Sequence, residues 1–259
     1  MSAFHKLSIK NYIQETANAV SIVFDVPENL KTNFSYKAGQ YITLKATVNG
    51  NEIRRAYSIC SAPESGELKV AIKAVENGVF STYATSQLKV GDLIEVHEPE
   101  GKFMLEPTKS NNYLGIAAGS GITPVLSMIK AVLQQEPSSS FTLIYGNKSS
   151  DETMFKAELD ALSVSYDTRF NLHYVFSRQN EERSLFGRID KGHTNYFIKN
   201  IYKNWSFKTA FLCGPEEMIK TVSTTLKENR YKESQILFEL FTASVKEENS
   251  SQIKEGLTE

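Results

Sequence analysis

The sequence predicts two domains of different fold class, an all-β antiparallel barrel followed by an α/β domain with a parallel sheet. From residue 4 to about residue 106 the chain carries only short alternating segments separated by turn residues, which is typical of a small barrel. From Asn112 onward, short apolar segments alternate with segments of helical period, which is typical of an α/β domain. A length of 259 residues is long for one domain, and two domains of roughly 110 and 130 residues are the natural expectation.

Composition and charge are those of an ordinary globular protein. The apolar fraction is 41%, the charged fraction 23% and the formal net charge −1, so nothing favours nucleic acid or an anionic membrane as a partner. The longest apolar runs are far too short to span a bilayer, and the first residues lack a basic-then-apolar signal pattern. We therefore expect a cytoplasmic protein.

Cysteine and histidine usage does not indicate a metal site or a disulfide framework. The two cysteines, Cys60 and Cys213, are far apart and fall in or near predicted strands. The four histidines show no spacing typical of metal ligands. We expect no metal centre.

Strand and turn patterns define the predicted barrel. The pair Asn49-Gly50 indicates a hairpin. One interruption stands out, because the pattern from Val79 to Leu88 is helical. The remaining segments are strands at residues 20–24, 41–44 and 68–73 and turns at residues 63–66 and 89–92.

The extended segment after the hairpin contains Arg55-Ala56-Tyr57-Ser58. Strand alternation puts Arg55 and Tyr57 on one face, about 7 Å apart. A cation beside an aromatic plane suits a ligand with both a phosphate and a flat ring. By itself, such a pair is more often a solvated charge beside a packed aromatic side chain.

The helical interruption of the barrel begins at Gly78-Val79-Phe80-Ser81. A helix N-terminus offers unpaired N–H groups and a positive dipole end, which suit a pyrophosphate. Gly78 would allow close approach, and Ser81 could donate its hydroxyl. A plain serine cap after a glycine explains the local sequence equally well.

The second domain is predicted from alternating strands and helices. A strand at residues 113–118 runs into Gly119-Ser120-Gly121, and Pro124 fits the first turn of the helix that follows. Residues 149–152 offer a capping box for a helix ending near Leu162. Further strands are predicted at residues 141–145, 172–177, 210–213 and 235–241, and a further helix opens at Pro215.

Two loops of this domain suit a dinucleotide. Gly119-Ser120-Gly121 opens a helix and can cradle a phosphate, although a plain connection is also consistent with it; Thr123-Pro124 replace the third glycine of the ordinary dehydrogenase motif. Ser177-Arg178 lies just past a strand end and suits a 2′-phosphate. Lys148 could add a second charge, although basic loop residues are usually only solvated.

These motifs together resemble the ferredoxin–NADP reductase superfamily, over roughly residues 4–241. Within it, the chain is most similar to reductase components of phenylacetyl-CoA oxygenase and related two-component oxygenases, and also to the reductase portion of flavohaemoglobins. The motifs follow the order of that superfamily: Arg55-Ala56-Tyr57-Ser58, Gly78-Val79-Phe80-Ser81, Val90-Gly91-Asp92, Gly119-Ser120-Gly121-Ile122-Thr123-Pro124, Tyr145-Gly146-Asn147, Ser177-Arg178, Cys213-Gly214-Pro215 and Phe238-Glu239-Leu240-Phe241.

The resemblance implies a Greek-key barrel that binds FAD and an α/β domain that binds NADP. It implies that Arg55 contacts the flavin phosphate, that Tyr57 packs on the isoalloxazine and that Ser58 lies near flavin N5. The predicted catalytic residues are Tyr57, Ser58, Cys213 and Glu239, with Cys213 near the reacting nicotinamide carbon. The predicted cofactor-binding residues are Arg55, Tyr57, Ser58, Ile72, Lys73, Gly78, Val79, Phe80, Ser81, Gly119, Gly121, Thr123, Ser177, Arg178, Cys213 and Phe241.

The activity implied by the resemblance is hydride transfer from NADPH to FAD, followed by one-electron steps to an acceptor. FAD is expected rather than FMN because the helical insert at Gly78 resembles the FAD-binding members. NADPH is expected over NADH because of Arg178. Residues 98–103 depart from the superfamily pattern by extra acidic residues, so the adenine end of FAD is poorly specified. From local sequence alone, Cys213 reads as inert core filler.

The predicted domains are residues 1–108, residues 109–241 and a polar tail or linker at residues 242–259. Oxygenase reductases of this kind carry an iron–sulfur ferredoxin domain after the reductase. The acceptor is therefore either such a domain, with this chain a fragment, or a separate ferredoxin or oxygenase component. Two other interpretations remain open: an NADH-linked flavin reductase serving a haem partner, and a nucleotide-binding module without turnover.

Overall fold

Two six-stranded sheets stand side by side in the structure, a computed structural model that describes residues 4–108 and 110–241. The first sheet is antiparallel and curled, and the second is parallel with helices on both faces. The predicted fold class is confirmed. The predicted tail at residues 242–259 lies outside the described residues.

The barrel sheet has the strand order β4-β3-β6-β1-β2-β5. Asn49 and Gly50 have φ angles of 52° and 79°, as a two-residue hairpin between β3 and β4 requires. The sheet curls until its two edges meet at a bridge between Ile59 and Val70. The strands are β1 (Phe4–Thr16), β2 (Ala19–Asp25), β3 (Tyr41–Val48), β4 (Asn51–Ser58), β5 (Leu68–Lys73) and β6 (Leu93–His97).

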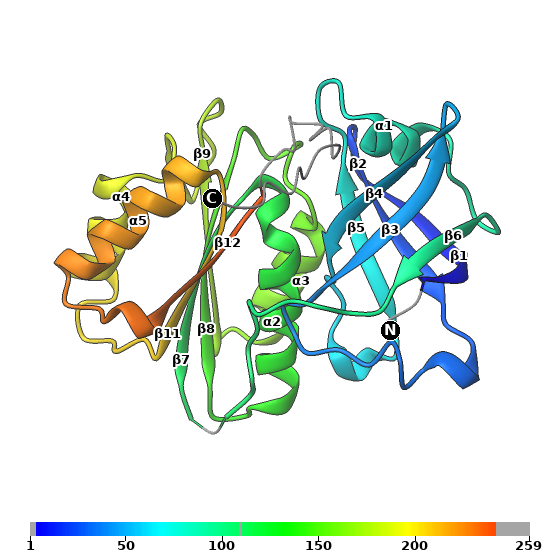
Figure 1. Cartoon of the computed structure of the whole chain (residues 1–259). Coiled ribbons are helices and arrows are strands. Elements are labelled where there is room, and N and C mark those ends of the chain that lie inside the picture. The colour runs from blue at the N-terminus through cyan, green and yellow to red at the C-terminus, as the bar shows by residue number, and fades with distance from the viewer. Residues whose placement is uncertain (1–3, 109, 242–259) are drawn as a thin grey trace, which may run out of the picture.

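The predicted helical interruption is confirmed as α1 (Val79–Ser86), which lies across one end of the barrel (Figure 1). It buries Phe80 and Ala84 in the barrel core. Strands β1 and β6 were not specified from the sequence. Much of β1 is exposed or half-buried on both faces, so its sequence shows no clean alternation.

The parallel sheet has the strand order β10-β9-β8-β7-β11-β12. Its strands are β7 (Asn112–Ala118), β8 (Ser140–Asn147), β9 (Phe170–Phe176), β10 (Ser184–Phe186), β11 (Thr209–Gly214) and β12 (Ile236–Leu240). The order reverses between β7 and β11, and the carboxyl ends of strands at such a switch point are where doubly wound sheets bind ligands. The predicted loop at Gly119 follows β7, and the Cys213-Gly214-Pro215 motif lies at the end of β11.

Helices cover both faces of this sheet. Helices α2 (Ile122–Gln135) and α3 (Lys156–Ser165) lie between the sheet and the barrel, while α4 (Lys191–Tyr196) and α5 (Glu216–Glu228) cover the far face (Figure 1). One apolar cluster joins α2 to the barrel residues Ala38, Phe103 and Leu105. The two sheets therefore share a core. None of the helices in the described ranges is long and apolar enough to cross a membrane.

The predicted capping box at residues 149–152 is wrong. Helix α3 begins at Lys156, after Phe155 in the left-handed region with a φ of 58°. The N–H of Ser150 donates to the side-chain oxygen of Gln179 at 2.9 Å, and the N–H of Thr153 donates to Ser150 O at 3.0 Å. A tertiary contact from the loop after β9 thus holds this segment as a turn and delays the helix.

Candidate functional site

Strand β4 carries the residues predicted to bind the flavin. Tyr57 is half-buried and its ring lies 5.8 Å from the Phe80 ring of α1, tilted by 35°. Arg55 is exposed, and its Nη1 donates to Arg54 O at 2.7 Å. Ser58 is buried at the end of the strand. This edge of the barrel therefore offers an exposed cation, an aromatic ring and a buried hydroxyl within four residues.

The start of α1 lies beside that strand. Ser81 Oγ donates to Gly78 O at 3.2 Å and accepts from the N–H of Val75 at 3.2 Å, so its hydroxyl ties the loop before α1 to the helix and does not cap an N–H group of the first helical turn. Gly78 leaves no space for a side chain, since an added Cβ would lie 2.4 Å from Val75 Cγ2. Val79 is exposed, whereas Phe80 fills the core beneath Tyr57.

Strand β5 lies at the other edge of the barrel sheet. Ile72 is fully buried, so only its backbone is available to a ligand. Lys73 Nζ lies 4.0 Å from Glu152 Oε2, and the same carboxylate lies 3.4 Å from Lys148 Nζ. Burial lowers the pKa of Lys73. Lys73 and Lys148 therefore share one counter-ion where the barrel borders the second domain.

The predicted phosphate loop is tied back to the protein through its carbonyl groups. Tyr145 of β8, fully buried, donates its hydroxyl to Gly119 O at 2.9 Å. Thr123 Oγ1 donates to Ser120 O at 3.0 Å. Gly119 has a φ of 54° and open space where a side chain would be. The role of Tyr145 was missed, because its motif was recognised but nothing in the local sequence shows where the hydroxyl points.

Ser177 and Arg178 follow β9 at the carboxyl edge of the parallel sheet. Their backbone N–H groups donate to Asn147 O at 3.0 Å and to Lys148 O at 2.8 Å, and the Arg178 side chain is exposed. The structure thus brings Lys148 beside Arg178.

The two domains meet at Ser58, Glu239 and Cys213. Ser58 Oγ donates to Glu239 Oε2 at 3.3 Å across 181 residues of sequence. Glu239 of β12 stands opposite Cys213 of β11 in the sheet register. Gly121 packs on the same point, because an added Cβ would lie 2.2 Å from Cys213 O. The end of the predicted flavin strand and the carboxyl end of β11 therefore border one another.

Burial sets the protonation of this junction. It raises the pKa of Glu239 to about 7, with the Ser58 hydrogen bond acting in the opposite direction. Burial, with the Glu239 carboxylate nearby, raises the pKa of the Cys213 thiol. Cys213 is therefore a neutral thiol at physiological pH, whereas Glu239 can hold or release a proton.

The last predicted residue, Phe241, follows β12 and is 37% exposed. It continues the strand that carries Glu239. Cavities of about 310 Å³ near Tyr36 and about 630 Å³ near Glu15 lie elsewhere on the molecule and contain none of the predicted residues.

Comparisons with known proteins match both parts of the chain to oxidoreductase domains. Residues 6–105 match the family described as "Oxidoreductase FAD-binding domain", and residues 116–224 match "Oxidoreductase NAD-binding domain". The chain is 41% identical to one of the subunits of the Escherichia coli 1,2-phenylacetyl-CoA epoxidase over 230 residues, 88% of this chain but less than two thirds, 65%, of that protein. It is 30% identical to NADH-cytochrome b5 reductase 1 of Laccaria bicolor, covering 89% of this chain and 74% of that one.

Solved structures of similar fold include flavoproteins with and without haem domains. The FAD/NAD-binding domain of a Vibrio cholerae nitric oxide dioxygenase has a TM-score of 0.80 at 23% identity, covering 92% of this chain and 99% of that one. A ferredoxin NADP+ reductase of Neisseria gonorrhoeae has a TM-score of 0.78 at 24% identity, covering 93% and 99%. At these identities the likeness shows the shared fold.

Proposed function

The chain belongs to the ferredoxin–NADP reductase superfamily of NAD(P)H-dependent flavoprotein oxidoreductases, and on that premise we propose that it transfers hydride from NADPH to FAD and then passes single electrons to a ferredoxin-type or oxygenase acceptor. The contact between Ser58 and Glu239 beside Cys213 carries the proposal. It joins the strand expected to bind flavin to the strand ends expected to meet the nicotinamide.

The described residues fit both cofactors. At Gly119 the backbone itself, without a Cβ, can face a phosphate, because open space lies beside it, whereas at Gly78 the corresponding space is filled by Ser81 and Val75. Tyr57 supplies an aromatic surface backed by Phe80. When bound, FAD supplies the exchange between two-electron and one-electron chemistry.

The contribution of the protein is to position the two cofactors against each other and to exclude water from the space between them. Tyr57 and Ser58 hold one side of the junction, and Gly121 and Cys213 the other. Holding two reacting rings in such an arrangement supplies roughly 7–11 kcal/mol of a barrier. Because Cys213 stays protonated, we assign it a packing role against the nicotinamide and no nucleophilic step.

Reduction by nucleotide tests the enzymatic assignment. The purified protein should be yellow and should bleach under anaerobic addition of NADPH. A protein that holds flavin but bleaches only with dithionite, or one that binds no flavin, contradicts the proposal. The second outcome would favour a nucleotide-binding module without turnover.

Preference for NADPH is proposed from Arg178 with Lys148 beside it. Arg178→Ala should raise the KM for NADPH at least about 10-fold, because a charge-assisted contact to a phosphate is lost, and should leave the KM for NADH unchanged. Arg230→Ala, an exposed arginine at the end of α5, is the matched control. Equal NADPH and NADH parameters in the Arg178 variant and the unmodified protein contradict this assignment.

An NADH-linked reductase serving a haem protein is the second candidate, because relatives at 30% identity are named NADH-cytochrome b5 reductase. Comparing NADPH with NADH, and a plant-type ferredoxin with cytochrome b5 as acceptor, separates the two. Faster reduction of ferredoxin supports the first candidate. Faster reduction of cytochrome b5, with NADH preferred, supports the second.

A further inference from the structure

Helix α2 connects the two halves of the candidate site. Its N-terminal end follows Gly121, which packs on Cys213 O. Two turns later the same helix reaches the barrel segment that follows the predicted flavin strand. Ser127 is six residues beyond Gly121, about 9 Å along a helix axis, so one rigid rod spans from the nicotinamide side to the flavin side.

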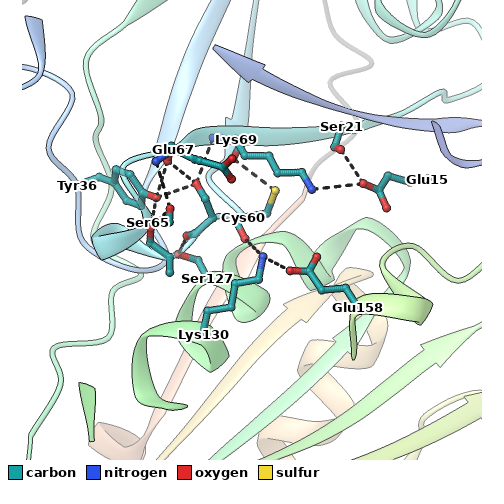
Figure 2. A network of polar contacts seen from close by, with 12 residues as sticks. Glu15, Ser21, Tyr36, Cys60, Ser65, Glu67, Lys69, Ser127, Lys130 and Glu158 are labelled. Atoms are coloured by element: carbon teal, nitrogen blue, oxygen red, sulfur yellow. Dashed lines mark hydrogen bonds and ion pairs between the residues drawn. The ribbon is translucent and has the colours of Figure 1, made fainter. Parts of the chain in front are cut away.

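Two side chains of α2 bind consecutive carbonyl groups of the barrel. Ser127 Oγ donates to Ser61 O at 2.6 Å, and Lys130 Nζ donates to Cys60 O at 3.2 Å. Figure 2 shows both side chains pointing from the helix to this segment. Ser127, Cys60 and Ser61 are at most 2% exposed, so these bonds are removed from water.

Lys130 is itself held in place from the second domain. Its ammonium group lies 2.5 Å from Glu158 Oε1 of α3, and its side chain is 12% exposed (Figure 2). The ion pair compensates part of the cost of burying the ammonium group. Helices α2 and α3 therefore present this donor as a unit.

The accepting segment is equally fixed within the barrel. The N–H of Cys60 donates to Lys69 O at 2.8 Å, and Ser61 Oγ donates to Glu67 O at 2.8 Å. Tyr36 Oη is 2.7 Å from Ser61 Oγ. Ser61 is three residues after Ser58, so a shift of α2 against this segment is a shift against the flavin strand.

The apolar part of the interface sets this register less sharply than hydrogen bonds do. Burial of Ala38, Phe103 and Leu105 against α2 is non-directional, so it holds the domains together while tolerating small displacements. Hydrogen bonds lose strength steeply with distance and angle. Two of them to adjacent carbonyl groups define both the position and the rotation of the helix.

We propose that Ser127 and Lys130 are positioning residues that set the separation between nicotinamide and isoalloxazine through α2. This inference rests on the proposed function. Neither residue need touch a cofactor. Loss of either hydrogen bond lets the helix shift, and a misplacement of about 1 Å costs up to about 100-fold in rate.

The test is anaerobic stopped-flow reduction of the FAD-loaded protein by NADPH in Ser127→Ala, Lys130→Met and Lys130→Arg. Gln134→Ala, an exposed residue of the same helix, is the matched control. We expect Ser127→Ala and Lys130→Met to slow hydride transfer at least about 10-fold, to weaken the nicotinamide–flavin charge-transfer absorbance and to alter the primary deuterium isotope effect. Flavin content, the dissociation constant for NADP+ and reduction by dithionite should match the control, and Lys130→Arg should restore most of the rate.

Equal hydride-transfer rates and charge-transfer bands in Ser127→Ala, Lys130→Met and the control overturn the inference. So does a loss of rate explained entirely by weaker nucleotide binding. If Ser127→Ala cannot hold flavin, the comparison of Lys130→Met with Lys130→Arg tests the inference by itself, since arginine retains the charge and the hydrogen-bond donor. An unmodified protein reduced by dithionite but by neither nucleotide refutes the proposed function instead, and the two failures are thereby distinguished.

Discussion

Glu239 is a carboxyl group placed where its charge is disfavoured. Burial raises its pKa from 4.5 in the unfolded chain to about 7, while Ser58 supplies one hydrogen bond. Between these two values the folded protein binds more protons than the unfolded one. The free energy of unfolding therefore falls as pH rises through this window. Above about pH 7 the folded protein bears the full cost of burying the ionised Glu239 carboxylate.

Replacing this carboxyl by an amide should remove the penalty. We expect Glu239→Gln to raise the free energy of unfolding by about 1–2 kcal/mol at about pH 8, after allowing for partial exposure, and to change it little at about pH 5. The amide oxygen still accepts from Ser58. Denaturant unfolding at both pH values measures this, with Glu217→Gln, an exposed glutamate of α5, as the control. A variant that is no more stable at the higher pH would contradict the assignment of Glu239.

Tyr145 is a residue whose hydroxyl acts on the loop before α2. It donates to Gly119 O and is fully buried, so Tyr145→Phe leaves the ring in place and removes one donor. We expect the KM for the nucleotide to rise about 5- to 20-fold, equivalent to about 1–2 kcal/mol for a lost buried hydrogen bond. The flavin content should not change. Unchanged steady-state parameters would show that the loop keeps its shape without this contact.

At the scale of elements, α2 and β11 meet backbone to backbone at Gly121. A Cβ there would lie 2.2 Å from Cys213 O and 2.5 Å from Cys213 C, and backbone atoms of a buried strand cannot move aside. Gly119 differs, because its φ of 54° is strained for other residues but open space surrounds it. The two glycines of one loop are therefore required for different physical reasons.

This difference predicts unequal effects of the same substitution. Gly121→Ala should cost at least about 2–3 kcal/mol of stability, because it forces α2 away from β11. The variant should also lose reduction of its flavin by NADPH. Gly119→Ala should cost only about 1 kcal/mol, from the left-handed backbone. Thermal unfolding and flavin bleaching measure both. Equal tolerance of the two substitutions would contradict the close contact at Cys213.

At the scale of the whole molecule, the segment between the two sheets is part of their common core. Phe103 is 7% exposed and its ring lies 5.8 Å from that of Phe211 in β11. The same apolar cluster contains barrel residues and α2 residues. The sheets should therefore unfold together.

Truncating that side chain should destabilise both sheets at once. We expect Phe103→Ala to lower the free energy of unfolding by about 3–5 kcal/mol. The transitions followed by flavin release and by helical circular dichroism should move to lower denaturant concentration by the same amount. Ile13→Ala, an exposed residue of β1, is the control. Two separate transitions in the variant, with only one shifted, would show that the sheets are independent.

The sequence by itself determined the type of most elements, because each depends on neighbours within a few residues. Alternation in residues 68–73 became β5, and Asn49-Gly50 became the hairpin turn. The Gly119-Ser120-Gly121 motif marked the start of α2. The predicted start of α3 is wrong because the side chain of Gln179, distant in sequence, accepts a hydrogen bond from the N–H of Ser150. Local signals are lost where a tertiary partner competes for the same backbone group.

The tertiary structure alone decided which of these elements meet. Ser58 and Glu239 form one junction although 181 residues separate them, and Ser127 reaches Ser61 from another domain. Such contacts depend on the position and rotation of one folded layer against another. Periodicity describes which face of an element is buried, but a hydrogen bond between layers requires placement to a fraction of an ångström, and periodicity does not specify that placement.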